Sequence, residues 1–546
     1  MNCGFPFSMV DSLLLALFPT LKFTRVINRA NDDCREINGV KGGCSFLKRG
    51  IGQMGQMRFH TSYMTDAELQ RLRRCYMVGM EGIAWERELS ISEKMLVIDR
   101  STHESGKLFV PWLRMDGVEV ILSTSSLREQ EAEYHLEVEL ARGTLNRLRN
   151  YLANRNQHFE ISAAYQSLLN KSQQSFMNAV LPTDDPESSQ RNAADSIETA
   201  LELIELVVLE DAGHAVEIRY QAGGLKPLIG IEMPVVPESE QSQQQIDEIF
   251  NTVTIPFNWR TLSPDTDKFN FDEIDGPLHW ALQHDKKIIA GPLVRLTDES
   301  IPEWMYLWES DFTAFQNYLV NYVGEVIQRY KGRVHVWHCA AGLNSTTGLR
   351  FSEEQVVRIA VDVVETIRRI DAQTPIVMSF DMPWGGYAAD RRTDLSPLQF
   401  AEALVRGDIG LNGIGLELNF GDGPNECGLY DCLAINALMN RWAQLQLPLV
   451  LSVSTENKHI LPGVVDCNLS DNADLDDTVD SLSGGLESNE AANLLMVLAS
   501  QGATQAILWN QLSDTPDRLA GLYTGDGKIK PLINDIQRLC KEQLGI

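Results

Sequence analysis

The residues best suited to chemistry in this 546-residue chain are carboxylic acids near the ends of short apolar runs in its second half. Glu417 interrupts one such run, Asp381 follows another, and Glu456 stands three residues beyond Val453, which lies in a third. Because a carboxylate is costly to bury without a partner, we expect Glu417 to face either a functional cavity or the outer helices. Carboxyl groups that meet in one cavity can act as a general acid and a general base. A solvated loop acid is the alternative for Glu456.

His338, next to Cys339, could serve as a metal ligand or a base. A metal-assisted reaction through His338, Asp381 and Glu417 is therefore one alternative chemistry. A histidine satisfied within the core is the structural alternative. The nine cysteines are odd in number and scattered along the chain, which favours reduced thiols in an intracellular protein. The sequence predicts no cofactor and no metal site.

The chain is strongly acidic, with 75 Asp and Glu against 47 Lys and Arg and a net charge of −28. Nucleic acids and anionic membranes are disfavoured as partners, because both attract basic proteins. No apolar run reaches the ~18 residues that indicate a membrane span, and the apolar stretch 9–21 lacks the flanks of a signal peptide. We therefore expect a cytoplasmic rather than a secreted protein.

The elements that must position these residues alternate between short apolar runs and helical stretches from residue 228 onward. This alternation predicts an α/β fold, a parallel sheet closed as a (β/α)8 TIM barrel. A doubly wound open sheet is the alternative. In a barrel the βα loops at the strand ends carry the functional residues, which is where the acids stand. The predicted strands are 228–231, 252–255, 287–290, 334–337, 376–379, 413–418, 449–453 and 506–509.

The first half of the chain follows a different pattern. Residues 1–56 are locally basic and show no helical or strand period, which is typical of a disordered extension or a wrongly assigned translation start. Residues 57–128 contain β-branched runs that predict a small β-rich domain. Residues 129–227 are predicted to be a helical segment with a polar linker at 183–190, followed by the barrel at 228–546.

Short motifs in the barrel half follow one another in a recognisable order. They include Asn258-Trp259, Ile301-Pro-Glu-Trp304, Gly413-Ile-Gly-Leu and Ile507-Leu-Trp509. With these motifs, residues 228–539 resemble glycoside hydrolase family 10, the β-1,4-xylanase family. The resemblance implies a (β/α)8 barrel, xylan or another β-linked polysaccharide as ligand or substrate, and a retaining mechanism that uses two glutamates.

Both glutamates that the resemblance implies are replaced at the matching positions. Gly342 stands where the family has its acid/base, and Val453 stands at the nucleophile position in an ungapped match. Glu417-Leu-Asn419 replaces the family's Q-x-H. Neither glycine nor valine can donate a proton or form a glycosyl ester. The resemblance therefore predicts a carbohydrate-active protein whose usual mechanism is lost, a pseudoenzyme.

Three alternatives remain beside that interpretation. The barrel could be an active hydrolase with relocated carboxylates, for which the candidates are Glu417, Glu456 and Asp381. It could be an enzyme with unrelated barrel chemistry, or a non-catalytic scaffold. Since sugar rings stack on aromatic side chains, we expect a carbohydrate ligand to contact polar or aromatic residues near the strand ends: Trp259, Trp304, Trp337, Asn419, Trp384 and Trp509.

Overall fold

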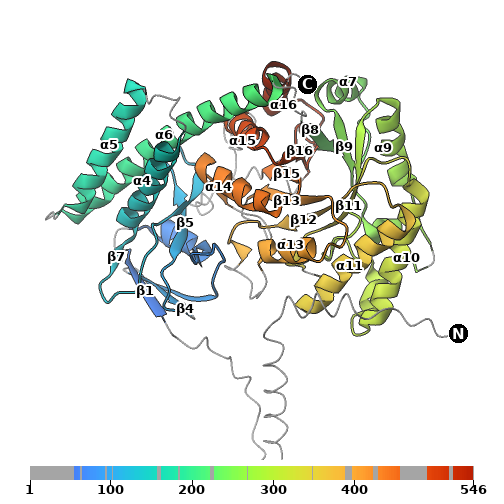
Figure 1. The fold of residues 1–546 in the computed structure, drawn as a ribbon, viewed down its shortest axis with the longest axis horizontal. Coiled ribbons are helices and arrows are strands. Elements are labelled where there is room, and N and C mark those ends of the chain that lie inside the picture. Colours follow the sequence, from blue (N-terminus) through green and yellow to red (C-terminus); the bar gives the residue numbers. More distant parts are fainter. Residues whose placement is uncertain are drawn as a thin grey trace, which may run out of the picture.

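The computed structural model places an N-terminal part built of sheets and helices beside a barrel (Figure 1). It describes residues 55–544 apart from internal gaps, so the predicted extension 1–56 lies almost wholly outside the described residues. Within those residues no helix is long and apolar enough to cross a membrane. The gaps are 62–63, 93–94, 101, 156–161, 182–184, 222–226, 267, 347, 388–395, 422–427, 456–487 and 516–520.

The barrel consists of eight strands closed in the order β10-β11-β12-β13-β15-β16-β8-β9, with every neighbouring pair parallel. This confirms the (β/α)8 fold and excludes the open sheet. The strands are β8 (Leu228–Glu232), β9 (Thr252–Ile255), β10 (Lys287–Ala290), β11 (Val336–Ala341), β12 (Ile376–Asp381), β13 (Gly413–Phe420), β15 (Leu449–Thr455) and β16 (Thr504–Trp509).

One strand departs clearly from the predicted range. The sequence predicts a strand at 334–337, but β11 begins at Val336 and extends to Ala341. The register with β12 shifts between His338 and Ala340, so a β-bulge lengthens the strand on this side. The alanines of the run carry no strong strand preference, which explains why the sequence pattern ended too early.

Helices cover the outside of the barrel, and clear N-terminal signals fix where several of them begin. Ser352 forms a capping box with Gln355 at the start of α11, and Ser396 forms one with Gln399 at the start of α13. The barrel helices are α7 (Glu240–Ile249), α8 (Trp259–Leu262), α9 (Asp272–Gln283), α10 (Phe312–Tyr330), α11 (Glu353–Ile370), α13 (Pro397–Arg406), α14 (Cys432–Trp442), α15 (Ser488–Ser500) and α16 (Pro531–Arg538).

A small apolar cluster from the strands lies apart from the main core. It joins Ile289, Val377, Val450, Ala506 and Leu508, which come from alternate and neighbouring strands of the barrel. Because these side chains contact one another and not the main core, we infer that they fill the barrel interior below the carboxyl ends of the strands. The polar residues described below lie closer to the carboxyl ends of the strands than this apolar cluster does.

The N-terminal part contains two four-stranded sheets, of order β3-β4-β1-β7 and β14-β6-β5-β2. The second sheet includes β14 (Leu429–Tyr430), which follows β13 of the barrel and pairs with β6 through Leu429–Val120 and Tyr430–Ile121. The two parts of the chain therefore share a sheet. The other strands are β1 (Gly55–His60), β2 (Tyr76–Val78), β3 (Arg87–Ile91), β4 (Met95–Arg100), β5 (Lys107–Leu113), β6 (Glu119–Ser123) and β7 (Tyr134–His135).

Three helices continue from these sheets, α4 (Leu136–Asn154), α5 (Ala163–Val180) and α6 (Pro186–Gln221), and α6 reaches the barrel while α5 packs against α6 and α4. The linker predicted at 183–190 is too long, because α6 begins at Pro186, where the fixed φ of proline suits the first helical turn. Arg219 of α6 donates to the carbonyl oxygens of Gln501 and Thr504 at 2.9 and 3.0 Å. The helical segment is thereby held against the barrel beside α15 (Figure 1).

Candidate functional site

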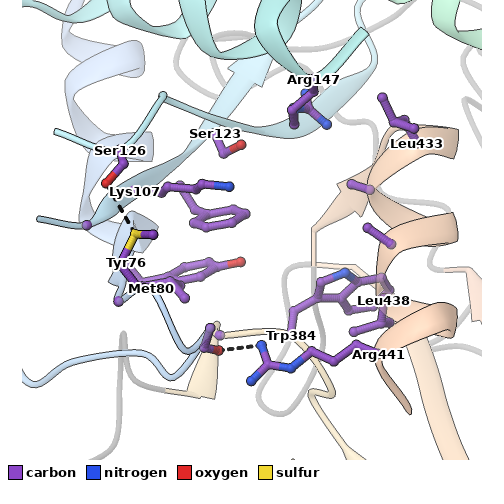
Figure 2. Close-up of a pocket in the computed structure, with 18 of the residues that line it drawn as sticks. Tyr76, Met80, Lys107, Ser123, Ser126, Arg147, Trp384, Leu433, Leu438 and Arg441 are labelled. Atoms are coloured by element: carbon purple, nitrogen blue, oxygen red, sulfur yellow. Dashed lines mark hydrogen bonds between the residues drawn. The ribbon is translucent and has the colours of Figure 1, made fainter. Parts of the chain in front are cut away.

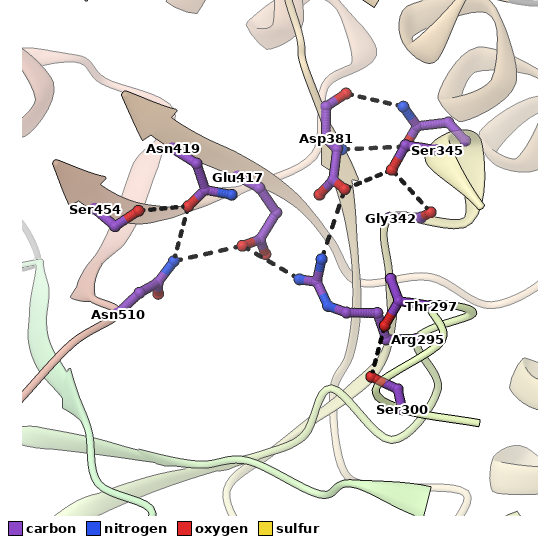
Figure 3. Close-up of polar contacts among 11 residues, drawn as sticks. Arg295, Thr297, Ser300, Gly342, Ser345, Asp381, Glu417, Asn419, Ser454 and Asn510 are labelled. Carbon is purple, nitrogen blue, oxygen red and sulfur yellow. Dashed lines mark hydrogen bonds and ion pairs between the residues drawn. The ribbon is translucent and has the colours of Figure 1, made fainter. Parts of the chain in front are cut away.

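A partly buried arginine joins two buried carboxylates near the carboxyl ends of the barrel strands. Asp381 ends β12 and is paired in register with Glu417 of β13. Arg295, which follows β10, reaches both: Nη1 lies 3.6 Å from Asp381 Oδ2 and Nη2 lies 3.6 Å from Glu417 Oε2. Figure 3 shows the guanidinium between the two acids. Asp381 is the last residue of β12, whereas Glu417 lies within β13, three residues before its end, and Arg295 is the cation between them.

Further hydrogen bonds fix Asp381 in place. Its carboxylate Oδ2 accepts from Ser345 Oγ at 2.5 Å, and the side chain is only 1% exposed. Asn344 closes a reciprocal pair with its backbone, accepting from Asp381 N at 3.1 Å and donating to Asp381 O at 2.9 Å. The carboxylate is therefore held by a charge and a hydroxyl in a site with little access for water.

Glu417 is buried beside the same arginine. Burial, and after it the charge of Asp381, raises the pKa of Glu417, while Arg295, Ser379 and Ser452 act in the opposite direction. Asn510 Nδ2 stands 3.5 Å from its Oε2. The raised pKa means that this carboxyl holds a proton to higher pH than an exposed glutamate does.

Arg295 remains a cation in spite of its burial. Desolvation lowers the pKa of Arg295. The negative charges of Asp381, Glu417 and Glu232 together raise it by more, so the net shift of the pKa is upward. Sequence analysis did not single out this arginine. The available signal was the run Gly291-Pro-Leu-Val-Arg295-Leu, in which a charged residue follows a buried strand of the barrel.

Gly342 lies beside the arginine and its partners, at the position that the resemblance assigns to the acid/base. It follows β11 directly and adopts a left-handed conformation with φ 63°. A Cβ atom added here would lie 2.5 Å from Asp381 Oδ2 and 3.2 Å from Arg295 Nη1. The direction in which a side chain would leave residue 342 is thus occupied by the Asp381–Arg295 ion pair.

Val453, at the position that the resemblance assigns to the nucleophile, belongs to β15 and is fully buried. Its neighbour Ser454 donates from Oγ to Asn419 Oδ1 at 2.7 Å, and Asn510 Nδ2 lies 3.4 Å from the same oxygen. Asn419 is therefore part of a polar network next to Glu417 (Figure 3). Glu456, the third candidate carboxylate, lies outside the described residues.

His338 is buried and lies inside the strand β11. Burial, and after it the charge of Arg295, lowers its pKa to about 3. Its Nε2 has no hydrogen-bond partner among the described residues. In the described part of the chain, no three His, Cys, Asp or Glu side chains gather as metal ligands would. The histidine is neutral at physiological pH.

The tryptophans expected to contact a ligand occupy different environments. Trp259, Trp337 and Trp509 are at most 2% exposed, so in this structure their rings pack in the core and offer no face to a sugar. Trp304 is partly buried, and its Nε1 donates to Ser263 O at 2.9 Å. Trp384 is also partly buried and lines a cavity between the barrel and the N-terminal part. Sequence alone could not separate these cases, because core packing and sugar stacking select the same residue type.

Comparison with known proteins relates the barrel to one enzyme family. Residues 224–348 match the family model "Glycosyl hydrolase family 10". Endo-1,4-beta-xylanase B of Thermotoga neapolitana is 27% identical over 105 residues, which is 19% of this chain and 30% of that protein. The chain thus matches less than a third of the length of this curated relative. The match with the family model includes Gly342 but ends before Asp381 and Glu417.

Solved xylanase structures can also be superposed on the chain. Xylanase 10B from Thermotoga petrophila RKU-1, in complex with xylobiose, gives a TM-score of 0.44 at 16% identity and covers 60% of this chain and 97% of its own. Xylanase 10B from Thermotoga maritima gives 0.44 at 14% identity, with 62% and 99% covered. The closed strand order and the match with the family model together lead to one conclusion: the chain contains a TIM barrel, and the part of it that includes the first four strands is similar to glycosyl hydrolase family 10.

Proposed function

We propose that the barrel binds a β-linked polysaccharide, xylan or a related glycan, and does not hydrolyse it by the two-glutamate retaining mechanism. The observation that supports this most directly is the environment of Gly342. A glutamate is required where this glycine stands, and the space it would enter holds the Asp381–Arg295 ion pair.

The chemistry of retaining hydrolysis explains why this matters. One carboxyl must protonate the leaving oxygen while another, about 5–5.5 Å away, attacks the sugar. General acid–base help of this kind contributes roughly 10²- to 10⁴-fold to the rate. Gly342 and Val453 supply neither group. A barrel without both groups keeps a binding surface and loses the covalent route.

The acids that remain are poorly suited to replace them. Asp381 and Glu417 are 1% and 4% exposed and share one guanidinium. A nucleophilic carboxylate has to contact the substrate directly. These two carboxylates are turned toward Arg295 instead. Their arrangement supports a structural role in shaping the mouth of the barrel.

One observation favours a second candidate, an active hydrolase with relocated carboxylates. Burial raises the pKa of Glu417, and a raised pKa is what a general acid near neutral pH requires. In that case Glu417 would act as the acid, and Glu456 would be the candidate nucleophile. The two proposals differ in the fate of the substrate, so they can be separated by experiment.

The test measures binding and hydrolysis on the same preparations. Isothermal titration with xylohexaose and with a mixed-linkage β-glucan oligosaccharide should detect binding to at least one of them. Release of reducing ends from xylan should not exceed the protein-free blank. Substitution Asn419→Ala should weaken binding roughly five- to tenfold through loss of a polar contact, while Asn440→Ala on the exposed side of α14 should not change it.

Two results would overturn the proposal. Turnover by the wild type that Glu417→Gln abolishes would establish the relocated-carboxylate hydrolase. Failure to bind either oligosaccharide would leave the barrel as a scaffold without a glycan ligand.

A further inference from the structure

The cavity that Trp384 lines lies where the N-terminal part meets the barrel, and neither Asp381 nor Glu417 is among its lining residues. Its volume is about 520 Å³, which is in the range of sites that hold small organic ligands. Strands β2 and β5 and helix α4 form one wall, and helix α14 with the loop after β12 forms the other (Figure 2).

The charge of this cavity is opposite to that of the protein. Among the residues that line it, all of them in the described part of the chain, three are basic and none is acidic: Lys107, Arg147 and Arg441. The whole chain carries a net charge of −28. A cluster of this kind is unexpected in so acidic a protein and favours an anionic ligand.

Two of the three cations are already engaged. Arg147 Nη1 lies 2.8 Å from Asp431 Oδ2, behind the cavity wall. Arg441 donates to the carbonyl oxygens of Gly82 and Glu81 at 2.7 and 2.6 Å. Lys107 pairs with no carboxylate in the described part of the chain, and its ammonium group points into the cavity (Figure 2). One uncommitted positive charge suits a monoanion better than a doubly charged phosphate.

Aromatic rings supply part of the cavity surface. Phe109 is backed by Tyr76, with ring centroids 4.9 Å apart and planes 4° from parallel. Trp384 is backed by Tyr430 at 4.2 Å and 10°. The rings of Phe109 and Trp384 are therefore each stacked on a second ring, and flat apolar bodies stack well on such rigid surfaces.

The two walls are fixed relative to each other, so the cavity is formed in advance. The hydroxyls of Tyr76 and Tyr430 lie 2.6 Å apart. Gly385 approaches the Tyr76 ring so closely that an added Cβ would be 2.4 Å from it. The shared β14–β6 pairing joins the same walls. A preformed site loses little entropy when a ligand binds.

We infer that this cavity binds a small aromatic carboxylate, whose ring lies between Phe109 and Trp384 and whose charge is paired with Lys107. The inference does not depend on the proposed glycan function, because none of the residues that support that proposal at the mouth of the barrel (Gly342, Asp381, Glu417 and Asn419) lines the cavity.

The probe pair 2-naphthoate and 2-naphthamide tests the inference, since the two differ in charge and hardly in shape. Isothermal titration of the full chain should give binding of the carboxylate, with the amide weaker by roughly tenfold or more. Addition of salt should weaken the binding of 2-naphthoate, because salt screens the ion pair. Saturating xylohexaose should leave the affinity for 2-naphthoate unchanged.

Two variants locate the site, and a third is the matched control. Lys107→Met should lower the affinity for 2-naphthoate to the affinity that the wild type has for 2-naphthamide. Ala437→Trp, on the exposed side of α14 that lines the cavity, should abolish binding by filling it. Lys171→Met removes an exposed lysine of α5 outside the cavity and should change nothing. Each variant should unfold at the temperature of the wild type.

Equal binding of the acid and the amide would overturn the inference, because charge would then play no part. Unchanged binding in Lys107→Met and Ala437→Trp would place the probe elsewhere on the protein and would equally refute it. Absence of binding by the folded wild type is the third refuting result. None of these outcomes bears on whether the barrel binds a glycan.

Discussion

The mouth of the barrel and the cavity between the two parts both contain cations, but these cations differ in whether the protein itself supplies a carboxylate partner. In the mouth, Arg295 is shared by Asp381 and Glu417. In the cavity, Lys107 has no carboxylate partner among the described residues, and none of the lining residues is acidic. Removing a cation that is paired within the protein leaves its carboxylate partners uncompensated, whereas a cation without such a partner is available to a ligand.

The largest effect should come from removing the cation of the mouth. Arg295→Met leaves two buried carboxylates without their common partner, and breaking such a pair costs about 3–5 kcal/mol. Denaturant unfolding of variant and wild type at neutral pH measures this free energy. Arg406→Met, which removes an exposed i,i+4 pair with Glu402, is the control and should cost less than about 0.5 kcal/mol. A loss below about 1 kcal/mol for Arg295→Met would mean that the ion pairs do not hold the mouth together.

The second-largest loss of stability should come from His338, whose pKa is lowered by burial and, after it, by the charge of Arg295. Its pKa is about 3 in the folded protein against an ordinary value of 6.5. Below pH 6.5 the unfolded chain takes up a proton that the folded protein refuses, so stability is lost as the pH falls. Between about pH 7.5 and pH 4.5 the loss from this group should reach roughly 2–3 kcal/mol. His338→Gln should remove this part of the pH dependence, which denaturant unfolding of wild type and variant from about pH 7.5 to about pH 4.5 measures. The same pH dependence of the unfolding free energy in both proteins would contradict this expectation.

The pH dependence of stability that Glu417 causes should be opposite to that of His338: stability is lost as the pH rises. Burial raises its pKa in the folded protein, so the folded state is favoured while the carboxyl is protonated and loses that stability as the pH rises above the ordinary value of 4.5. Glu417→Gln lacks this dependence and should gain stability relative to the wild type as the pH is raised from about 4 to about 7. Denaturant unfolding of both proteins across this range measures the gain. A pH-independent difference would show that burial does not raise the pKa of this carboxyl.

The smallest effect should come from the cavity. Lys107→Met removes a charge that has no carboxylate partner in the described residues, so it should change the free energy of unfolding by less than about 0.5 kcal/mol. The difference between the losses of unfolding free energy in Lys107→Met and Arg295→Met tests the comparison between the two regions most directly. A loss of about 2 kcal/mol or more would mean that Lys107 is a structural cation like Arg295.

The barrel could be predicted from sequence because its strands are short apolar runs with helices between them, a pattern that depends on local neighbours. The acids Asp381 and Glu417 followed from the same pattern, since parallel strand ends meet on one side. The partner Arg295 was missed, because which side chains meet across the mouth depends on distances between strands far apart in the chain. The cavity was missed for a stronger reason: its walls come from β5 and α14, and no local pattern links them.

The strand β14 was invisible for a related reason. It has two residues, Leu429 and Tyr430, and it becomes a strand only because β6 lies beside it. Residues 429–445 have a helical period, so a sequence-based prediction includes the strand in the helix that begins at Cys432. Tertiary pairing decided the outcome against local preference.

This shared sheet also constrains the order in which the protein can assemble during synthesis. Tyr76 and Tyr430, whose hydroxyls meet, are separated by 354 residues. The N-terminal sheet therefore leaves the ribosome with the edge of β6 unpaired, and it waits for most of the barrel to be translated before β14 arrives. An unpaired edge is a template for association with other chains. The nascent chain is most exposed to aggregation in that interval, and a fragment ending before residue 429 keeps the exposed edge permanently.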